Sequence, residues 1–219
     1  MYEGYKSLAY CPRCATPLSN FEVNQGYQDT QDPSITVRFR VRDTERRSLL
    51  AWTTTPWTLP SNLAVAVGPE IADSVFEHEG RRLILGAGTV AKYESELADA
   101  RSVGTIRGHE LEGRSYKPIF PFFRDNPGSF RVIGADFVDV EEGTGIVHMA
   151  PGFGEDDMEV CEQAGIPLVC PVDDAGQFTE AVPPYAGTNV FEANRAVIRD
   201  LRDEGVLVKQ ESYVHGYPH

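Results

Sequence analysis

Residues 52–62, with the sequence WTTTPWTLPSN, place the strongest limit on how this chain can fold. β-Branched threonine favours a strand, but Pro56 has no N–H for a strand ladder, so a strand that enters this segment must end within it. The segment also contains both tryptophans of the protein. Small hydroxyls beside aromatic rings are typical of a pocket for a small, partly polar ligand. The alternative is a threonine-rich edge strand followed by a proline turn.

The threonines can be assigned to faces if the strand continues through them. Thr53 and Thr55 would then share one face, and Thr54 would point to the other. We expect Thr58, Ser61 and Asn62 to follow in a loop that folds back over the same space.

The 20 glycines and 15 prolines indicate many turns and short elements. Apolar periodicity predicts strands at residues 35–42, 48–53, 63–67, 75–78, 82–85, 130–140, 145–149 and 206–214. Helices are expected at residues 89–100, 155–164 and 189–204, the last capped by Asn189 with Glu192 and ended by Gly205. The pattern predicts a strand-dominated α+β fold.

The chain is acidic, with a net charge of −13 at pH 7. Because lysine and arginine supply most of the affinity for a phosphate backbone, a nucleic acid partner would have to be held largely by other domains. No run of apolar residues is long enough to span a membrane, and the N-terminus has no signal-peptide pattern. We therefore expect a cytoplasmic protein with reduced cysteines and no membrane partner.

A second segment, residues 143–157 (GTGIVHMAPGFGEDD), combines glycines with ionisable groups. Its glycines allow sharp turns or a close approach of the backbone. His148 lies on a predicted strand, where a structural role is the commoner alternative. Asp156 and Asp157 open a predicted helix, where carboxylates also complement the helix dipole.

Cys11 and Cys14 have the C-x-x-C spacing of zinc ligands. Tetrahedral zinc needs four ligands, and Cys161 and Cys170 are too far along the chain to form a good second pair. His215 and His219 are weak candidates. The sequence therefore contains half of a zinc site.

Together, residues 52–62 and 143–157 closely resemble the two signature segments of the editing domain of isoleucyl-tRNA synthetases. Valyl and leucyl relatives carry Thr-Thr-Arg-Pro where this chain has TTPWT at residues 54–58, which favours the isoleucyl branch. Weaker similarity extends to residues 11–20 (CPRCATPLSN), 31–34 (QDPS) and 212–219 (SYVHGYPH).

The resemblance implies a β-barrel-like editing domain at residues 31–219, after a zinc-ribbon-like segment at residues 1–30. It implies hydrolysis of mischarged valyl-tRNA(Ile), and of valyl-adenylate as a further option, in a pocket that excludes isoleucine. The implied partners are the 3′ end of valyl-tRNA(Ile) and the rest of the parent synthetase, with this piece monomeric and unable to activate isoleucine. Editing itself would need no cofactor. Zinc would be bound in the full-length enzyme. Several members of the family have a second C-x-x-C directly after the segment that resembles residues 215–219, and this chain stops just short of it.

The resemblance also assigns the site. Asp157 would receive the α-ammonium of the substrate, and His148 would limit pocket size, with a general-base role as the runner-up. The threonines would line the pocket and position water, Asn62 would make a polar contact, and Trp57 would form a wall. The implied catalytic residues are Thr53, Thr54, Thr55, His148 and Asp157; the implied substrate-binding residues are Trp57, Thr58, Asn62, His148 and Asp157; the metal ligands are Cys11 and Cys14.

Two other functions remain open at this point. A free-standing hydrolase could clear mischarged tRNA in trans, and deacylation without the parent enzyme would favour it. A non-catalytic, zinc-ribbon-like interaction module would bind zinc stoichiometrically and show no deacylation.

Overall fold

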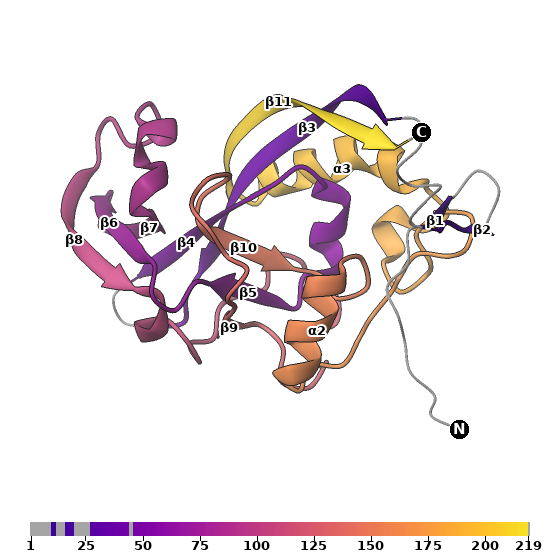
Figure 1. Ribbon diagram of the computed structural model, residues 1–219, viewed down its shortest axis with the longest axis horizontal. Coiled ribbons are helices and arrows are strands. Elements are labelled where there is room, and N and C mark those ends of the chain that lie inside the picture. Colours follow the sequence, from indigo (N-terminus) through magenta and orange to yellow (C-terminus); the bar gives the residue numbers. More distant parts are fainter. Residues whose placement is uncertain (1–9, 12–15, 20–26, 44–45, 219) are drawn as a thin grey trace.

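The computed structural model describes residues 10–11, 16–19, 27–43 and 46–218 of the chain (Figure 1). These residues form a strand-rich mixed α/β fold, as the sequence predicts. The larger of its two main sheets has the order β11-β3-β4-β7-β6-β8. Its strands are β3 (Tyr27–Arg40), β4 (Arg47–Thr53), β6 (Ala72–His78), β7 (Arg81–Gly86), β8 (Arg101–Arg107) and β11 (Leu207–Pro218).

The smaller sheet lies at the centre of the molecule and has β5 (Ala64–Val67) as its middle strand. β9 (Arg131–Gly134) pairs with β5 in parallel and β10 (Ile146–Met149) pairs with it antiparallel. All four residues of β5 are fully buried, which explains why this strand is a continuous apolar run. The two sheets do not close into a barrel within the described residues.

Two α-helices complete the described core. α2 (Glu155–Gln163) follows β10, and α3 (Val190–Asp203) runs beside β3 and β11 (Figure 1). Asn189 caps α3, because its side-chain oxygen accepts a hydrogen bond from the Phe191 N–H at 3.0 Å, and the part predicted for Glu192 in this cap stays a prediction. Gly205 follows the helix end with φ of 63°, the left-handed conformation that glycine adopts most easily.

The prediction of an α-helix at residues 89–100 is wrong. A 3₁₀ helix, η2 (Ala87–Tyr93), is followed by turns that lead into β8. The spacing of Tyr93 and Leu97 nevertheless places both side chains in a small apolar cluster with Leu50, Leu83 and Leu85. The apolar pattern thus identified the buried face, although packing and not an α-helical backbone produces it.

Two further differences have clear causes. The strand predicted at residues 130–140 ends at Gly134, because the chain turns there, with the Val138 N–H bonded to the Ala135 carbonyl at 3.3 Å. β8 has no counterpart among the predicted strands. It is an edge strand whose residues are almost all exposed, so it lacks the alternating apolar pattern on which the prediction depends.

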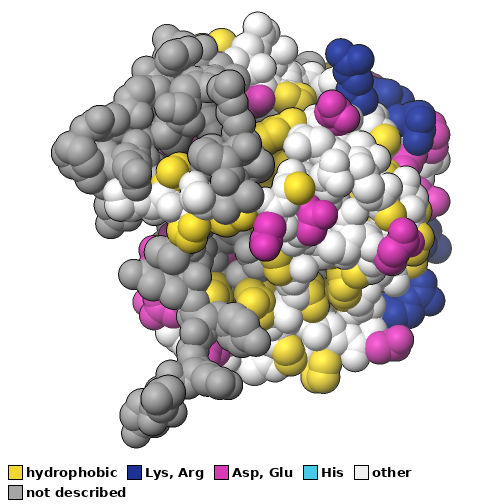
Figure 2. Space-filling view, turned by 90° about the vertical axis from the view of Figure 1, so that its right-hand side faces the viewer, with side chains coloured by type: hydrophobic (Ala, Val, Ile, Leu, Met, Phe, Trp, Pro, Cys, Tyr) yellow, Lys and Arg dark blue, Asp and Glu magenta, His cyan; other side chains and the backbone are white. Residues whose placement is uncertain are grey.

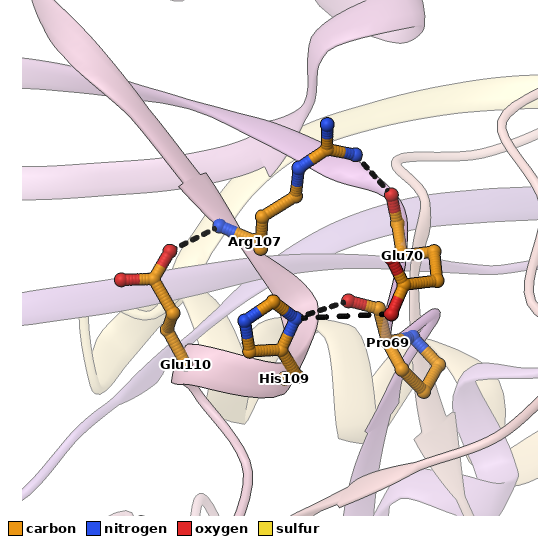
Figure 3. A network of polar contacts seen from close by, with 5 residues as sticks. All are labelled: Pro69, Glu70, Arg107, His109 and Glu110. Carbon is orange, nitrogen blue, oxygen red and sulfur yellow. Dashed lines mark hydrogen bonds and ion pairs between the residues drawn. The ribbon is translucent and has the colours of Figure 1, made fainter.

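A polar network joins β8 to the turn before β6 (Figure 3). The Arg107 guanidinium donates to the Glu70 carbonyl, and the Arg107 N–H donates to Glu110 Oε1 at 2.9 Å. His109 Nδ1 lies 3.1 Å from the Pro69 carbonyl oxygen. These contacts surround the short 3₁₀ helix η3 (Gly108–Glu110) and hold it against the turn at residues 69–70, between β5 and β6.

The N-terminal part is described only in pieces. β1 (Tyr10–Cys11) pairs with β2 (Thr16–Pro17), whereas Cys14 and His219 lie outside the described residues. β3 begins at Tyr27 and so crosses the proposed division between residues 30 and 31, which itself stays a prediction. Among the described helices, none has the length and apolar character that crossing a membrane requires.

Candidate functional site

A cavity of about 350 Å³ brings the two sequence segments together. Residues 52–55 and 58 form one side, and residues 142–148 form another. The loop at residues 150–154, the first turn of α2 and the turn at residues 137–139 complete it. The lining residues are Trp52, Thr53, Thr54, Thr55, Thr58, Phe137, Val138, Asp139, Glu142, Gly143, Thr144, Gly145, Ile146, Val147, His148, Ala150, Phe153, Gly154 and Asp157.

The threonine side of the cavity is shaped by the end of β4. The strand stops at Thr53, so the alternating arrangement expected through Thr55 does not form, and Thr54 lines the cavity with the others. The Thr55 N–H donates to Thr53 Oγ1 at 3.1 Å, a side-chain bond in place of a strand ladder. Pro56 then begins the 3₁₀ helix η1 (Pro56–Ser61) instead of the expected loop.

A chain of hydroxyls connects this side to His148. Oγ1 of Thr55 lies 3.2 Å from that of Thr53 and 3.3 Å from that of Thr58. The Thr58 hydroxyl donates to the Thr55 carbonyl at 2.8 Å, and its oxygen lies 2.9 Å from His148 Nε2. Since a hydroxyl has one proton, an arrangement that keeps the Thr58 bond to the Thr55 carbonyl has Nε2 as the donor to Thr58, with the proton of the neutral imidazole on Nε2.

His148 is held neutral by its surroundings. It lies on β10 opposite Val65 and is 7% exposed. Burial lowers the pKa of His148 to about 4, and Nδ1 has no hydrogen-bond partner among the described residues. An imidazole with this pKa is a weak base near neutral pH, so its bulk and its bond to Thr58 are its main contributions to the cavity.

Asp157 supplies a carboxylate at the opposite end of the second segment. It lies in the first turn of α2, and its Oδ2 accepts a hydrogen bond from the Ala150 N–H at 2.7 Å. Burial raises the pKa of Asp157; the Ala150 amide opposes this rise, and neighbouring Asp156 adds to it. Gly154 leaves room for this carboxylate, because a β-carbon there would stand 3.1 Å from Asp157 Cγ. A bound cation would stabilise the ionised form.

Two residues assigned to the site do not reach the cavity. The side-chain amide of Asn62 donates to the Ala64 carbonyl at 2.7 Å, and its oxygen accepts from the Tyr116 hydroxyl at 2.6 Å. Asn62 is therefore a buried structural residue in this structure. Trp57 packs edge-on against Phe153, with ring centroids 4.8 Å apart, so it supports the cavity wall from behind.

Sequence reasoning missed the turn at residues 137–139. Phe137 is 38% exposed at the cavity, although large apolar side chains are usually buried. This turn lies just before the second segment in the sequence, but no local pattern marks it as part of a site. Trp52 was not predicted as a site residue, yet it lines the cavity. Gly143 packs closely against it, because a β-carbon at Gly143 would stand 3.1 Å from the indole.

The described residues contain no group of three or more histidine, cysteine, aspartate or glutamate side chains that could hold a metal ion. Of the two predicted ligands, Cys14 is not described, and only the backbone of Cys11 is. Zinc binding through Cys11 and Cys14 thus remains a prediction.

The fold defines the class of protein. The structure superposes on the crystal structure of GlLeuRS-CP1 with a TM-score of 0.63 at 14% identity, covering 81% of this chain and 98% of that one. It also matches the cytosolic leucyl-tRNA synthetase editing domain of P. knowlesi, with a TM-score of 0.59 at 11% identity, covering 92% and 100%. The chain has the fold of a tRNA-synthetase editing domain.

Sequence comparison shows which synthetases the chain is similar to. The whole chain is 47% identical to part of the isoleucine–tRNA ligase of Bdellovibrio bacteriovorus and covers 21% of it. It is also 47% identical to part of the Mycobacterium tuberculosis ligase, of which it covers 23%. No protein-family model matches the sequence. Over its whole length the chain is similar to part of these isoleucine–tRNA ligases, and it spans about a fifth of their length.

Proposed function

We propose that this domain edits aminoacyl-tRNA by hydrolysing the ester of valyl-tRNA(Ile). The observation that carries the proposal is the single cavity in which a hydroxyl-rich wall, a neutral imidazole and a partly buried carboxylate converge. A terminal adenosine with its amino acid offers each of these groups a partner. The ribose and ester suit the hydroxyls, the ammonium suits the carboxylate, and the side chain suits the apolar remainder.

The need for such a site follows from the limits of binding energy. A single methylene changes the free energy of binding in an apolar pocket by about 1–3 kcal/mol, a figure known for isoleucyl-tRNA synthetases and not obtained from this chain. A first site cannot reject valine on that basis, whereas a second site can reject isoleucine by size. His148 is the proposed limit, because its ring is buried and fixed to Thr58 at 2.9 Å and therefore cannot easily move aside.

Asp157 is the proposed receptor of the substrate ammonium. One carboxylate oxygen is fixed by the Ala150 N–H, which leaves the other for a charge-assisted contact. This contact would fix the direction in which the amino acid enters. It also selects an amino acid ester over an ester without an amino group.

Direct attack by water fits the cavity better than a covalent intermediate. Thr58 and His148 are within hydrogen-bond distance, but the Thr58 proton is donated to the Thr55 carbonyl and Nε2 of His148 is itself a donor. The histidine therefore cannot remove the threonine proton in this arrangement. The proposed roles of Thr53, Thr54, Thr55 and Thr58 are to contact the ribose and to position the attacking water.

The surface charge of the domain bears on how much of the tRNA it binds. On the face shown in Figure 2, acidic side chains are scattered, whereas lysine and arginine gather along one edge. With a net charge of −13, the domain is suited to hold the tRNA end while other parts of a synthetase hold the body. Valyl-adenylate presents the same ammonium and side chain, and so it is a second proposed substrate of the same cavity.

A deacylation assay of this chain on valyl-tRNA(Ile) and isoleucyl-tRNA(Ile) tests the proposal. We expect loss of the valyl ester and protection of the isoleucyl ester. Equal hydrolysis of both esters would contradict the size limit. Complete protection of both, with a folded chain and no binding of a non-hydrolysable valyl-adenosine analogue, would contradict the proposed substrate.

A further inference from the structure

A second cavity of about 390 Å³ lies directly beside the first. Trp52, Glu142 and Gly143 belong to the lining of both, so these residues form the ridge between them. The remaining lining residues of the second cavity are Ser34, Lys92, Tyr93, Glu141, Lys209, Glu211, Ser212 and Tyr213. The function proposed above uses none of these residues.

The walls of this cavity are aromatic. Tyr213 meets Trp52 edge-on, with ring centroids 5.3 Å apart, whereas the ring of Tyr93 is almost fully buried beneath Lys209. The Tyr213 hydroxyl donates to Glu142 Oε1 at 3.2 Å, which fixes that ring relative to the ridge. Aromatic rings of this kind are the usual surface for an unpaired nucleobase.

The charges exclude a simple phosphate site. Lys209 is paired with Glu211 at 3.1 Å and stands 5.0 Å above the centre of the Tyr93 ring. Lys92 donates to the main-chain carbonyl of Glu141 at 2.6 Å. Three carboxylates (Glu141, Glu142 and Glu211) and two lysines line the cavity, so its lining carries a net negative charge. A phosphate would meet net repulsion there, whereas a neutral base with an amino group would not.

We propose that the second cavity binds the base of the nucleotide that precedes the terminal adenosine, a cytosine in the CCA end of tRNA. Cytosine presents an N4 amino donor, which suits the carboxylates of Glu141 and Glu142, and ring acceptors, which suit the ammonium of Lys92. The shared ridge places this base next to the first cavity, as a nucleotide joined to the terminal adenosine requires. The inference rests on the proposed function, because it assumes that the first cavity holds the adenosine.

The test compares two non-hydrolysable ligands on the folded chain. One is 3′-valylamino-3′-deoxyadenosine, and the other is the same nucleoside extended by a 5′-linked cytidine. We expect the cytidine extension to tighten binding by about tenfold. Replacing the cytosine by uracil should remove most of that gain, because O4 of uracil is an acceptor that faces carboxylates.

Substitutions in the second cavity test whether the gain in affinity from cytidine arises there. Tyr213→Ala and Lys92→Ala should each reduce it, whereas Tyr213→Phe, which keeps the ring, should preserve most of it. Lys117→Ala, an exposed lysine outside both linings, is the control. Affinity for the mononucleoside should stay within about twofold throughout.

The outcomes separate the two proposals. If the mononucleoside binds and cytidine adds nothing, or adds a gain that uracil and Tyr213→Ala leave intact, the second site is refuted and the first stands. A domain that binds neither ligand contradicts both.

Discussion

The two segments that build the cavity use their polar groups in opposite ways. In residues 52–62, Thr53, Thr55 and Thr58 bond to one another and to the backbone, and Asn62 is bonded within the core. In residues 143–157, His148 has an unpartnered Nδ1, and Asp157 has one oxygen beyond its bond to Ala150. The first segment is a framework, and the second provides the groups that respond to charge and size.

The difference shows why neither segment is a site alone. A network of satisfied hydroxyls is rigid but has no charge with which to orient a ligand. Buried ionisable groups can orient a ligand, but their position depends on neighbours that do not move. Substitutions of His148 and Asp157 should therefore change activity above all, whereas substitutions of the bonded threonines should lower both activity and stability.

The largest expected effect is that of Asp157→Ala. Losing a charge-assisted contact worth about 1.5–3 kcal/mol should lower kcat/KM for valyl-tRNA deacylation by about 10- to 150-fold. Single-turnover hydrolysis measures this. Asp156→Ala is the matched control, because Asp156 is the exposed neighbour in the same helical turn. Full activity of Asp157→Ala would remove its role as the ammonium receptor.

A slightly smaller effect is expected from His148→Ala. Removing the ring should admit isoleucine and raise deacylation of isoleucyl-tRNA by about 10- to 100-fold, the scale of one methylene in a pocket. His148→Phe keeps the bulk without the imidazole and should keep isoleucine protected. If both variants cleave isoleucyl-tRNA equally, the bond to Thr58 and not the size of the ring controls specificity.

Asn62→Ala should act on stability. It leaves the hydroxyl of Tyr116, a fully buried residue, without its partner, at a cost of about 1–3 kcal/mol in the free energy of unfolding. Denaturant unfolding of Asn62→Ala, Tyr116→Phe and the double variant measures the coupling. We expect kcat of the folded Asn62→Ala protein to change little. A large loss of kcat with unchanged stability would show instead that Asn62 acts in the site.

The smallest expected effect is a shift in pH dependence. Burial and Asp156 both raise the pKa of Asp157, and only the ionised carboxylate attracts an ammonium. Activity should therefore rise with pH as Asp157 loses its proton. Asp156→Ala removes one cause of the raised pKa, so the acidic limb of the pH–kcat/KM profile should move to lower pH. A shift to higher pH would contradict this assignment.

Much of the secondary structure was predictable from local sequence patterns. β4, β5, β7 and β10, together with both α-helices, match the predicted elements within a few residues, because their apolar periodicity or continuous apolar runs are strong. β8 was not predicted, since an exposed edge strand has little to bury. The helix expected at residues 89–100 shows that apolar spacing reports which side chains are inside and does not fix the backbone.

The sequence by itself determined the two segments, their family resemblance and the residue types that carry charge and hydroxyls. Only the tertiary structure decided which of them meet. Asn62 and Trp57 belong to the first segment but lie outside the cavity, whereas Phe137, from the turn just before the second segment, lies within it. The physical reason is that a side chain's place depends on long-range strand pairing and packing. His148 reaches Thr58 because β10 pairs with β5, and this pairing is not encoded within either segment.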